Sequence, residues 1–222
     1  MRRILIAPCL LALAACKPGD SRQAAAGSGT GADSAGTGAR VAWSYNPHAQ
    51  VTLTGGDPLT VETGPAVIVW PAGAKPLAPP YTVRARLQKH TGRLHEGTGL
   101  LFGGADLDKP ENQQSYSYFL TRGDGSFLIK LRKGAEIPIV QDWTAHPSVR
   151  RDTEEGGRAN DLMVQVTAQD VAFFINGTQV ARLPAAQFQT RGVAGLRVSH
   201  ELQLEVTGFQ ASPGIHPPDV RP

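Results

Sequence analysis

The stretch Leu162–Arg182, LMVQVTAQDVAFFINGTQVAR, consists of three short runs rich in apolar and β-branched residues. Asn176-Gly177 separates the second run from the third. Asn-Gly is the strongest short signal for a two-residue hairpin, because a type I′ turn needs a positive φ at both of its central positions. The stretch therefore predicts consecutive antiparallel strands over 162–167, 171–175 and 178–182.

The same pattern extends along the chain in both directions. In Tyr81–Gln88, apolar residues alternate with Thr and Arg, as expected for a strand with one buried face. Asp124-Gly125 forms a second turn signal, glycine and proline separate the runs, and no window of a dozen residues has a convincing helical pattern. Regularly spaced strands with turn signals predict an all-β antiparallel sandwich or barrel. Further strand-like runs cover 116–121, 127–132, 195–198 and 202–206.

The N-terminus has the character of an export signal. Arg2 and Arg3 precede an apolar run, Ile4–Ala15. This run is shorter than the roughly 20 residues that a membrane-spanning helix requires, and it fits the apolar region of a signal peptide. We therefore predict export.

Leu13-Ala14-Ala15-Cys16 resembles the lipobox of bacterial lipoproteins. The resemblance implies cleavage before Cys16, lipid attachment to Cys16 and a membrane partner reached through that lipid. Because Lys17 follows, rather than the Asp typical of inner-membrane retention, we expect anchoring at the outer membrane, facing the periplasm or the cell surface. An ordinary signal peptide with a nearby cysteine remains the alternative.

Composition divides the chain into segments. Residues 17–40 are dominated by Gly, Ala, Ser and Thr, a composition typical of a flexible, disordered linker. We expect a signal peptide at 1–15, a lipidated N-terminus and linker at 16–40, a β-sandwich at 41–212 and a proline-rich tail at 213–222. The only cysteines are Cys9 and Cys16, so we expect a sandwich without disulfides.

Charge argues against a nucleic-acid partner. The formal net charge is +3, and removal of Arg2 and Arg3 with the signal peptide leaves +1 (20 − 19). The sequence has no stripe of basic residues interleaved with aromatic ones, the usual pattern of a nucleic-acid interface. We therefore predict no nucleic-acid binding.

A series of motifs resembles the concanavalin A-like jelly roll of the laminin-G type over about 81–209, with 41–80 supplying leading strands. The resemblance implies an antiparallel β-sandwich. This fold carries lectins, adhesion modules and glycoside hydrolases, so it does not define a function by itself. In chain order the motifs are Tyr81–Ala85, Gly99–Gly104, Tyr116–Phe119, Asp124–Ile129, Trp143, Asn160–Leu162, Phe174–Gly177 and Gly192–Leu196.

Catalytic activity is left uncertain by the sequence. The Glu-x-Asp-x-x-Glu motif of the glucanase branch is absent, and Glu201 and Glu205 have the wrong spacing for it. Another branch, associated with hydrolysis or elimination on keto-sugars, has a similar series of strands. No catalytic residue can be carried over from it, so we predict none and favour a non-catalytic protein.

One cluster of aromatic and hydrogen-bonding residues has the chemistry of a sugar- or peptide-binding surface. The alternative is that Trp143 and the two tyrosines are core residues, since aromatic side chains contribute heavily to cores. Arg84 is assigned to the same surface from a neighbouring strand, together with Arg86. The candidate ligand-binding residues are Tyr116, Tyr118, Arg122, Arg84, Trp143 and His146.

A calcium ion is the one candidate cofactor. Asp106 and Asp108, with Glu111 nearby, place the hard oxygen ligands that Ca²⁺ prefers in one segment. Taken together, these patterns predict an anchored lipoprotein whose jelly roll binds a carbohydrate or another component of the cell envelope. The alternatives are a sugar-processing hydrolase or lyase of the keto-sugar type and a structural lipoprotein that binds a protein partner.

Overall fold

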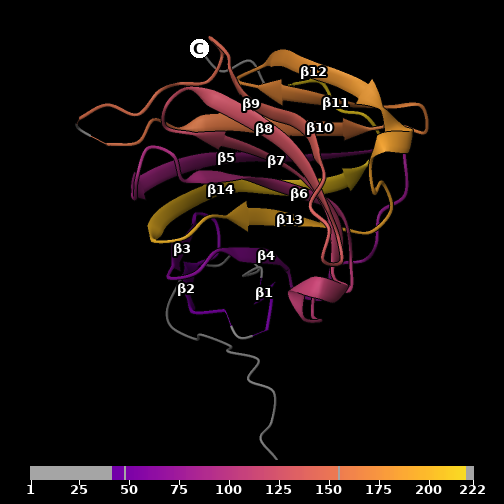
Figure 1. Cartoon of the computed structure of the whole chain (residues 1–222), viewed down its shortest axis with the longest axis horizontal. Helices are drawn as coiled ribbons and strands as arrows, with labels where there is room; N and C mark the ends of the chain where they lie inside the picture. Colours follow the sequence, from indigo (N-terminus) through magenta and orange to yellow (C-terminus); the bar gives the residue numbers. More distant parts are fainter. Residues whose placement is uncertain (1–41, 48, 155, 219–222) are drawn as a thin grey trace, which may run out of the picture.

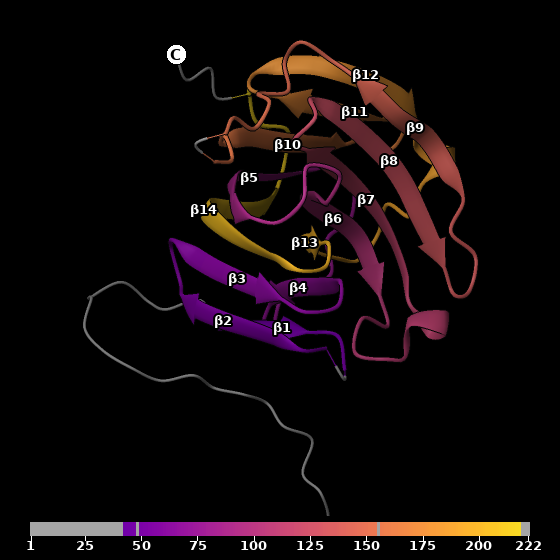
Figure 2. The same cartoon turned by 60° about the vertical axis from the view of Figure 1, so that its left-hand side comes forward.

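The computed structural model describes residues 42–47, 49–154 and 156–218. The signal peptide, the linker and the lipidated Cys16 predicted above lie outside these residues. Within them the chain forms two seven-stranded sheets that face each other (Figures 1 and 2). No helix among the described residues is long and apolar enough to span a membrane.

Sheet A has the strand order β1-β4-β13-β6-β7-β8-β9, and every pairing in it is antiparallel. A short 3₁₀ helix, η1 (Glu111–Gln113), precedes β7. The bounds are β1 (Trp43–Tyr45), β4 (Val67–Pro71), β13 (Val193–Val198), β6 (Gly97–Ala105), β7 (Ser115–Arg122), β8 (Ser126–Lys133) and β9 (Ile139–Ala145).

Sheet B has the order β12-β11-β10-β5-β14-β3-β2, also antiparallel throughout. A second 3₁₀ helix, η2 (Ala185–Gln187), follows β12. The all-β antiparallel sandwich predicted from the sequence is therefore confirmed. The bounds are β12 (Thr178–Pro184), β11 (Asp170–Ile175), β10 (Asn160–Val166), β5 (Tyr81–Thr91), β14 (Leu202–Pro213), β3 (Leu59–Thr63) and β2 (Val51–Gly55).

Both predicted hairpins are confirmed. Asn176 and Gly177 join β11 to β12 with φ values of 50° and 82°, the positive values that the turn requires. The Asn176 side chain fixes this turn to the sandwich, since its Nδ2 donates to the Ser148 carbonyl at 2.7 Å. Gly125, with φ 87°, lies in the turn between β7 and β8.

The space between the sheets is filled by the inward-facing residues of alternating strands. In β5 these are Tyr81, Val83, Ala85 and Leu87, all buried, whereas the residues between them face outward. Burial of this apolar surface contributes about 25 cal/mol per Å² and is the main stabilising term.

Sheet A departs from the simple rule of one apolar face. A second cluster of buried apolar side chains lies on its outer face, opposite the main core. Leu107, from the segment between β6 and η1, belongs to this cluster and so covers part of the sheet. Strands β6, β7 and β8 therefore bury apolar residues on both faces. The cluster consists of Ile68, Leu101, Leu107, Tyr116, Tyr118, Leu120 and Leu128, with Trp70, Trp143 and Val193 half-buried against it.

Candidate functional site

Four of the predicted ligand-binding residues meet on the outer face of sheet A. Tyr116, Tyr118 and Arg122 alternate along β7 with inward-facing residues such as Phe119. Trp143 reaches the same face from β9. The strand pattern thus brings together residues that are up to 27 positions apart (143 − 116).

The two tyrosines form the base of this face rather than its surface. Tyr116 and Tyr118 are only 2% and 8% exposed, and their ring centroids lie 5.7 Å apart. The Tyr116 hydroxyl accepts a hydrogen bond from Arg132 Nε at 3.3 Å. Burial raises the pKa of Tyr118, although the positive charges of Arg197 and Arg132 oppose the rise. The tyrosines thus support the residues above them.

Two half-buried indoles provide the accessible aromatic surface. Trp143 extends from β9 until its ring tip lies over Gly97 of β6, where any side chain would collide with it. The guanidinium carbon of Arg122 lies 4.3 Å from the centroid of the Trp143 ring, a cation–π contact. Asp124 holds Arg122 in this position through a 2.6 Å bond from Nε. Trp70 lies on β4, toward the other edge of the same cluster.

Two cations without acidic partners complete the face. Lys130 is the direct cross-strand neighbour of Tyr118, and its own neighbours in β8 point into the core. Arg197 points outward from β13 and donates to the carbonyls of Val67 and Val198 at 3.2 and 3.0 Å. Neither cation forms an ion pair with another residue of the described chain. We call Trp70, Tyr118, Arg122, Lys130, Trp143 and Arg197 the aromatic-cationic face.

Arg84 and His146 lie elsewhere. Arg84 is on the outer face of sheet B, where its Nε and one terminal nitrogen donate to Gln210 Oε1 at 2.9 and 2.6 Å. Arg86 points the same way and pairs with Asp161 at 2.9 Å. The His146 ring packs against Phe127, a core residue, with 6.1 Å between ring centroids. The sequence pattern could not separate these two faces.

The residues of the predicted calcium site lie on the exposed segment after β6. Asp106 adopts a positive φ of 54°, and the Asp108 carboxylate is 3.8 Å from Lys109 Nζ. Glu111 pairs instead with Arg132 at 3.3 Å. Within the described chain, no group of three or more His, Cys, Asp or Glu side chains is arranged to hold a metal ion. Calcium binding at Asp106 and Asp108 stays a prediction.

Glu201 and Glu205, the two carboxylates compared above with the glucanase motif, lie just before and in the first half of β14 in sheet B. Glu205 faces His90 at 3.4 Å, and Glu201, in a positive-φ conformation, faces Arg93 at 3.6 Å. On the aromatic-cationic face, the nearby acids Asp124 and Glu111 are each paired with an arginine. The face is therefore equipped to stack against a ligand and to donate hydrogen bonds to it.

Sequence reasoning missed Trp70, Lys130 and Arg197. Each stands one position away from residues that the strand pattern assigns to the core, so alternation alone places it on an outer face. Nothing in the sequence shows that three different strands bring these outward positions to the same surface.

Comparisons with protein-family models and with curated protein sequences find no match. Among solved structures, the chain is similar to the carbohydrate binding module CBM66 from Bacillus subtilis, with a TM-score of 0.57, 9% identity, and coverage of 78% of this chain and 96% of that one. It is also similar to a Bacillus subtilis protein of unknown function with a galectin-like fold, with a TM-score of 0.56, 11% identity, and coverage of 76% and 88%. At these identities the likeness shows the fold alone, which is a jelly-roll β-sandwich of the galectin-like kind.

Proposed function

We propose that the protein binds a carbohydrate of the cell envelope, without chemically changing it, through the aromatic-cationic face. The observation that carries this proposal is the presence of two half-exposed indoles, Trp70 and Trp143, above a buried tyrosine layer and beside Arg122, Lys130 and Arg197. Indole rings offer flat apolar area to the C–H groups of a sugar, and cationic side chains donate hydrogen bonds to its oxygens. The likeness to a carbohydrate binding module supports this proposal at the level of the fold.

The proposal includes a lipid anchor at Cys16 in the outer membrane. Support comes from the lipobox-like Leu13–Cys16 and from the short apolar run before it. Stable anchoring takes two or more acyl chains, which lipoprotein processing at a cysteine supplies. The anchor would hold the sandwich near envelope glycans on the periplasmic or outer side.

Binding can be tested on a glycan array with the full chain carrying Cys16→Ala, which removes the lipid. We expect retention on at least one glycan class, and an approximately thirtyfold loss with Trp143→Ala or Trp70→Ala, about 2 kcal/mol, the effect typical of a central aromatic anchor. Arg84→Ala, on the opposite sheet, is the matched control and should bind normally. Absence of retention on every glycan would contradict the proposal.

The anchor has a separate test. Membrane fractionation of cells that express the unmodified chain should recover the protein with the membranes, and Cys16→Ala should move it to the soluble fraction. If the Cys16→Ala protein still sediments with membranes, lipidation at this cysteine is wrong, whatever the glycan array shows.

A further inference from the structure

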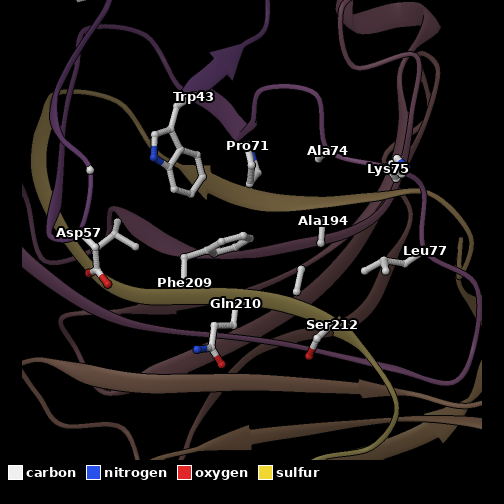
Figure 3. Close-up of a pocket in the computed structure, with 13 residues that line it drawn as sticks. Trp43, Asp57, Pro71, Ala74, Lys75, Leu77, Ala194, Phe209, Gln210 and Ser212 are labelled. Carbon is white, nitrogen blue, oxygen red and sulfur yellow. The ribbon is translucent and has the colours of Figure 1, made fainter. Parts of the chain in front are cut away.

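A cavity of about 520 Å³ lies between the sheets, where β1 and β4 of sheet A approach β14 of sheet B (Figure 3). Small-molecule sites in proteins typically measure about 300–1,000 Å³. The cavity is on the inner side of sheet A, because the buried, inward-facing Ala194 of β13 lines it. It is therefore separate from the aromatic-cationic face on the outer side.

The walls of the cavity are largely apolar. Trp43 and Phe209 meet edge to face across one side, with 5.2 Å between ring centroids. Val206 and Ala194 line the cavity from the main core. Ala194 is the smallest inward-facing residue of its strand, after which Leu196 follows, so the space beside it is left open. An occupant must therefore present mostly apolar surface.

Polar groups mark the two ends of the cavity. Asp57 and Lys75 lie at opposite ends in Figure 3. Asp57 Oδ1 already accepts a hydrogen bond from the Gly208 amide at 2.9 Å. Lys75, in contrast, is exposed and forms no ion pair with any described residue. The free positive charge therefore favours an occupant with an anionic group at the Lys75 end.

The indole nitrogen of Trp43 lies at the end of the cavity that is opposite to Lys75. Trp43 Nε1 is buried and has no hydrogen-bond partner in the described chain. In Figure 3 this nitrogen edge is turned toward the Asp57 side of the cavity. Buried donors are normally paired, and leaving one unpaired is costly. Because Trp43 Nε1 is fully buried and lies away from Lys75, an occupant would contact the ring of Trp43 rather than this nitrogen.

We propose that this cavity binds a small amphipathic carboxylic acid, such as a medium-chain fatty acid, with its apolar chain packed against the wall that Trp43 and Phe209 form together and its carboxylate beside Lys75. The hydroxyls of a sugar would face apolar walls there, which disfavours a carbohydrate as occupant. The site does not depend on the glycan function of the outer face.

The three tryptophans of the chain make the test direct. Trp43 lines the cavity, whereas Trp70 and Trp143 belong to the aromatic-cationic face. We would follow the indole N–H signals of the full chain carrying Cys16→Ala by NMR, with Trp43→Phe for assignment, while adding decanoate below its micelle concentration. We expect a saturable shift of the Trp43 signal alone. Equal shifts of all three signals, or no saturable shift of the Trp43 signal, would overturn the proposal.

Variants locate the site and its charge preference. Ala194→Leu and Ala74→Leu fill the cavity from two different walls, and each should weaken decanoate binding at least about tenfold. Because Ala74 is half-buried in the segment after β4, its variant should keep the fold even if Ala194→Leu does not. Normal decanoate binding by a folded Ala74→Leu or Ala194→Leu variant would refute the site.

Lys75→Met should weaken decanoate binding by roughly tenfold and leave binding of the uncharged decanol unchanged. Lys109→Met, an exposed lysine outside the cavity, is the control and should behave as the unmodified chain. If Lys75→Met weakens decanoate and decanol binding equally, Lys75 does not recognise the carboxylate, and the proposal of an anionic occupant is wrong. A glycan that moves only the Trp70 and Trp143 signals would support the outer site whether or not decanoate binds.

Discussion

Trp143 and Tyr118 share the outer face of sheet A but occupy different depths in it. Tyr118 is covered by its neighbours, whereas the Trp143 ring is half-exposed and stacked against Arg122. The sequence left open whether either residue was core or surface. Depth on a sheet face depends on which long side chains extend over it from other strands, and those contacts are made only in the folded chain.

At the residue scale, Asp170 predicts a pH dependence of stability. A hydrogen bond from Arg182, at 2.7 Å, lowers the pKa of Asp170 below its ordinary value of 3.8, against an opposing effect of burial. Because folding lowers this pKa, the carboxylate stabilises the fold above the pKa of the unfolded chain. That contribution is lost as pH falls through the lowered pKa of the folded chain.

We therefore expect Asp170→Asn to have a lower Tm than the unmodified chain at neutral pH, with the difference shrinking as the pH falls below about 4. Thermal unfolding followed by circular dichroism across this range measures it. In a chain that also carries Arg182→Met, the Asp170→Asn substitution should lower the Tm at neutral pH by a smaller amount. A difference in Tm that grows on acidification would contradict the sign of the shift.

At the scale of elements, β14 shows why an alternating strand pattern is not enough to predict which residues face the core along the whole strand. Leu202, Leu204 and Val206 alternate inward as the sequence predicts. A register shift between Thr207 and Gln210 then interrupts the pairing with β5. Phe209, within the shifted segment, and Ala211, just after it, pack against the core and line the cavity. The bulge depends on the pairing of β14 with β5, in which Thr207 faces Arg86, 121 positions away (207 − 86), and the local sequence does not reveal it.

The β11–β12 hairpin carries a prediction at this scale. Asn176 Oδ1 accepts from the Asp161 amide, and Nδ2 donates to Ser148 and Asn160, all within 2.8 Å. Asn176→Ala removes these hydrogen bonds. It also leaves alanine at a positive φ, a conformation that is strained for a residue with a Cβ atom. We expect a loss of about 2–3 kcal/mol in the free energy of unfolding, measured with urea.

The neighbouring Thr178→Ala is the matched control, because Thr178 is exposed at the start of β12. Its effect should stay within about 0.5 kcal/mol. If Asn176→Ala proves as mild as Thr178→Ala, the hairpin does not depend on the side-chain bonds of Asn176.

At the scale of the whole molecule, the described sandwich contains no cysteine, since Cys9 and Cys16 both precede it. Its stability must come from burial between the sheets. We expect the Tm of the full chain carrying Cys16→Ala to be the same with and without a reducing agent. A drop of several degrees under reduction would contradict this account.

The sequence by itself determined the all-β class, both hairpins and most of the strands from Tyr81 onward, because alternation and the Asn-Gly and Asp-Gly turns are local properties. It also indicated that Tyr116, Tyr118, Arg122 and Trp143 belong together. Only the tertiary structure decided that Trp70, Lys130 and Arg197 join them and that Arg84 faces the opposite way. The cavity lined by Trp43 and Phe209 likewise forms only when strands from the two sheets come together. The reason is physical: alternation assigns a residue to one face or the other, but the order of strands in a sheet, set by pairings between distant segments, decides which residues meet there.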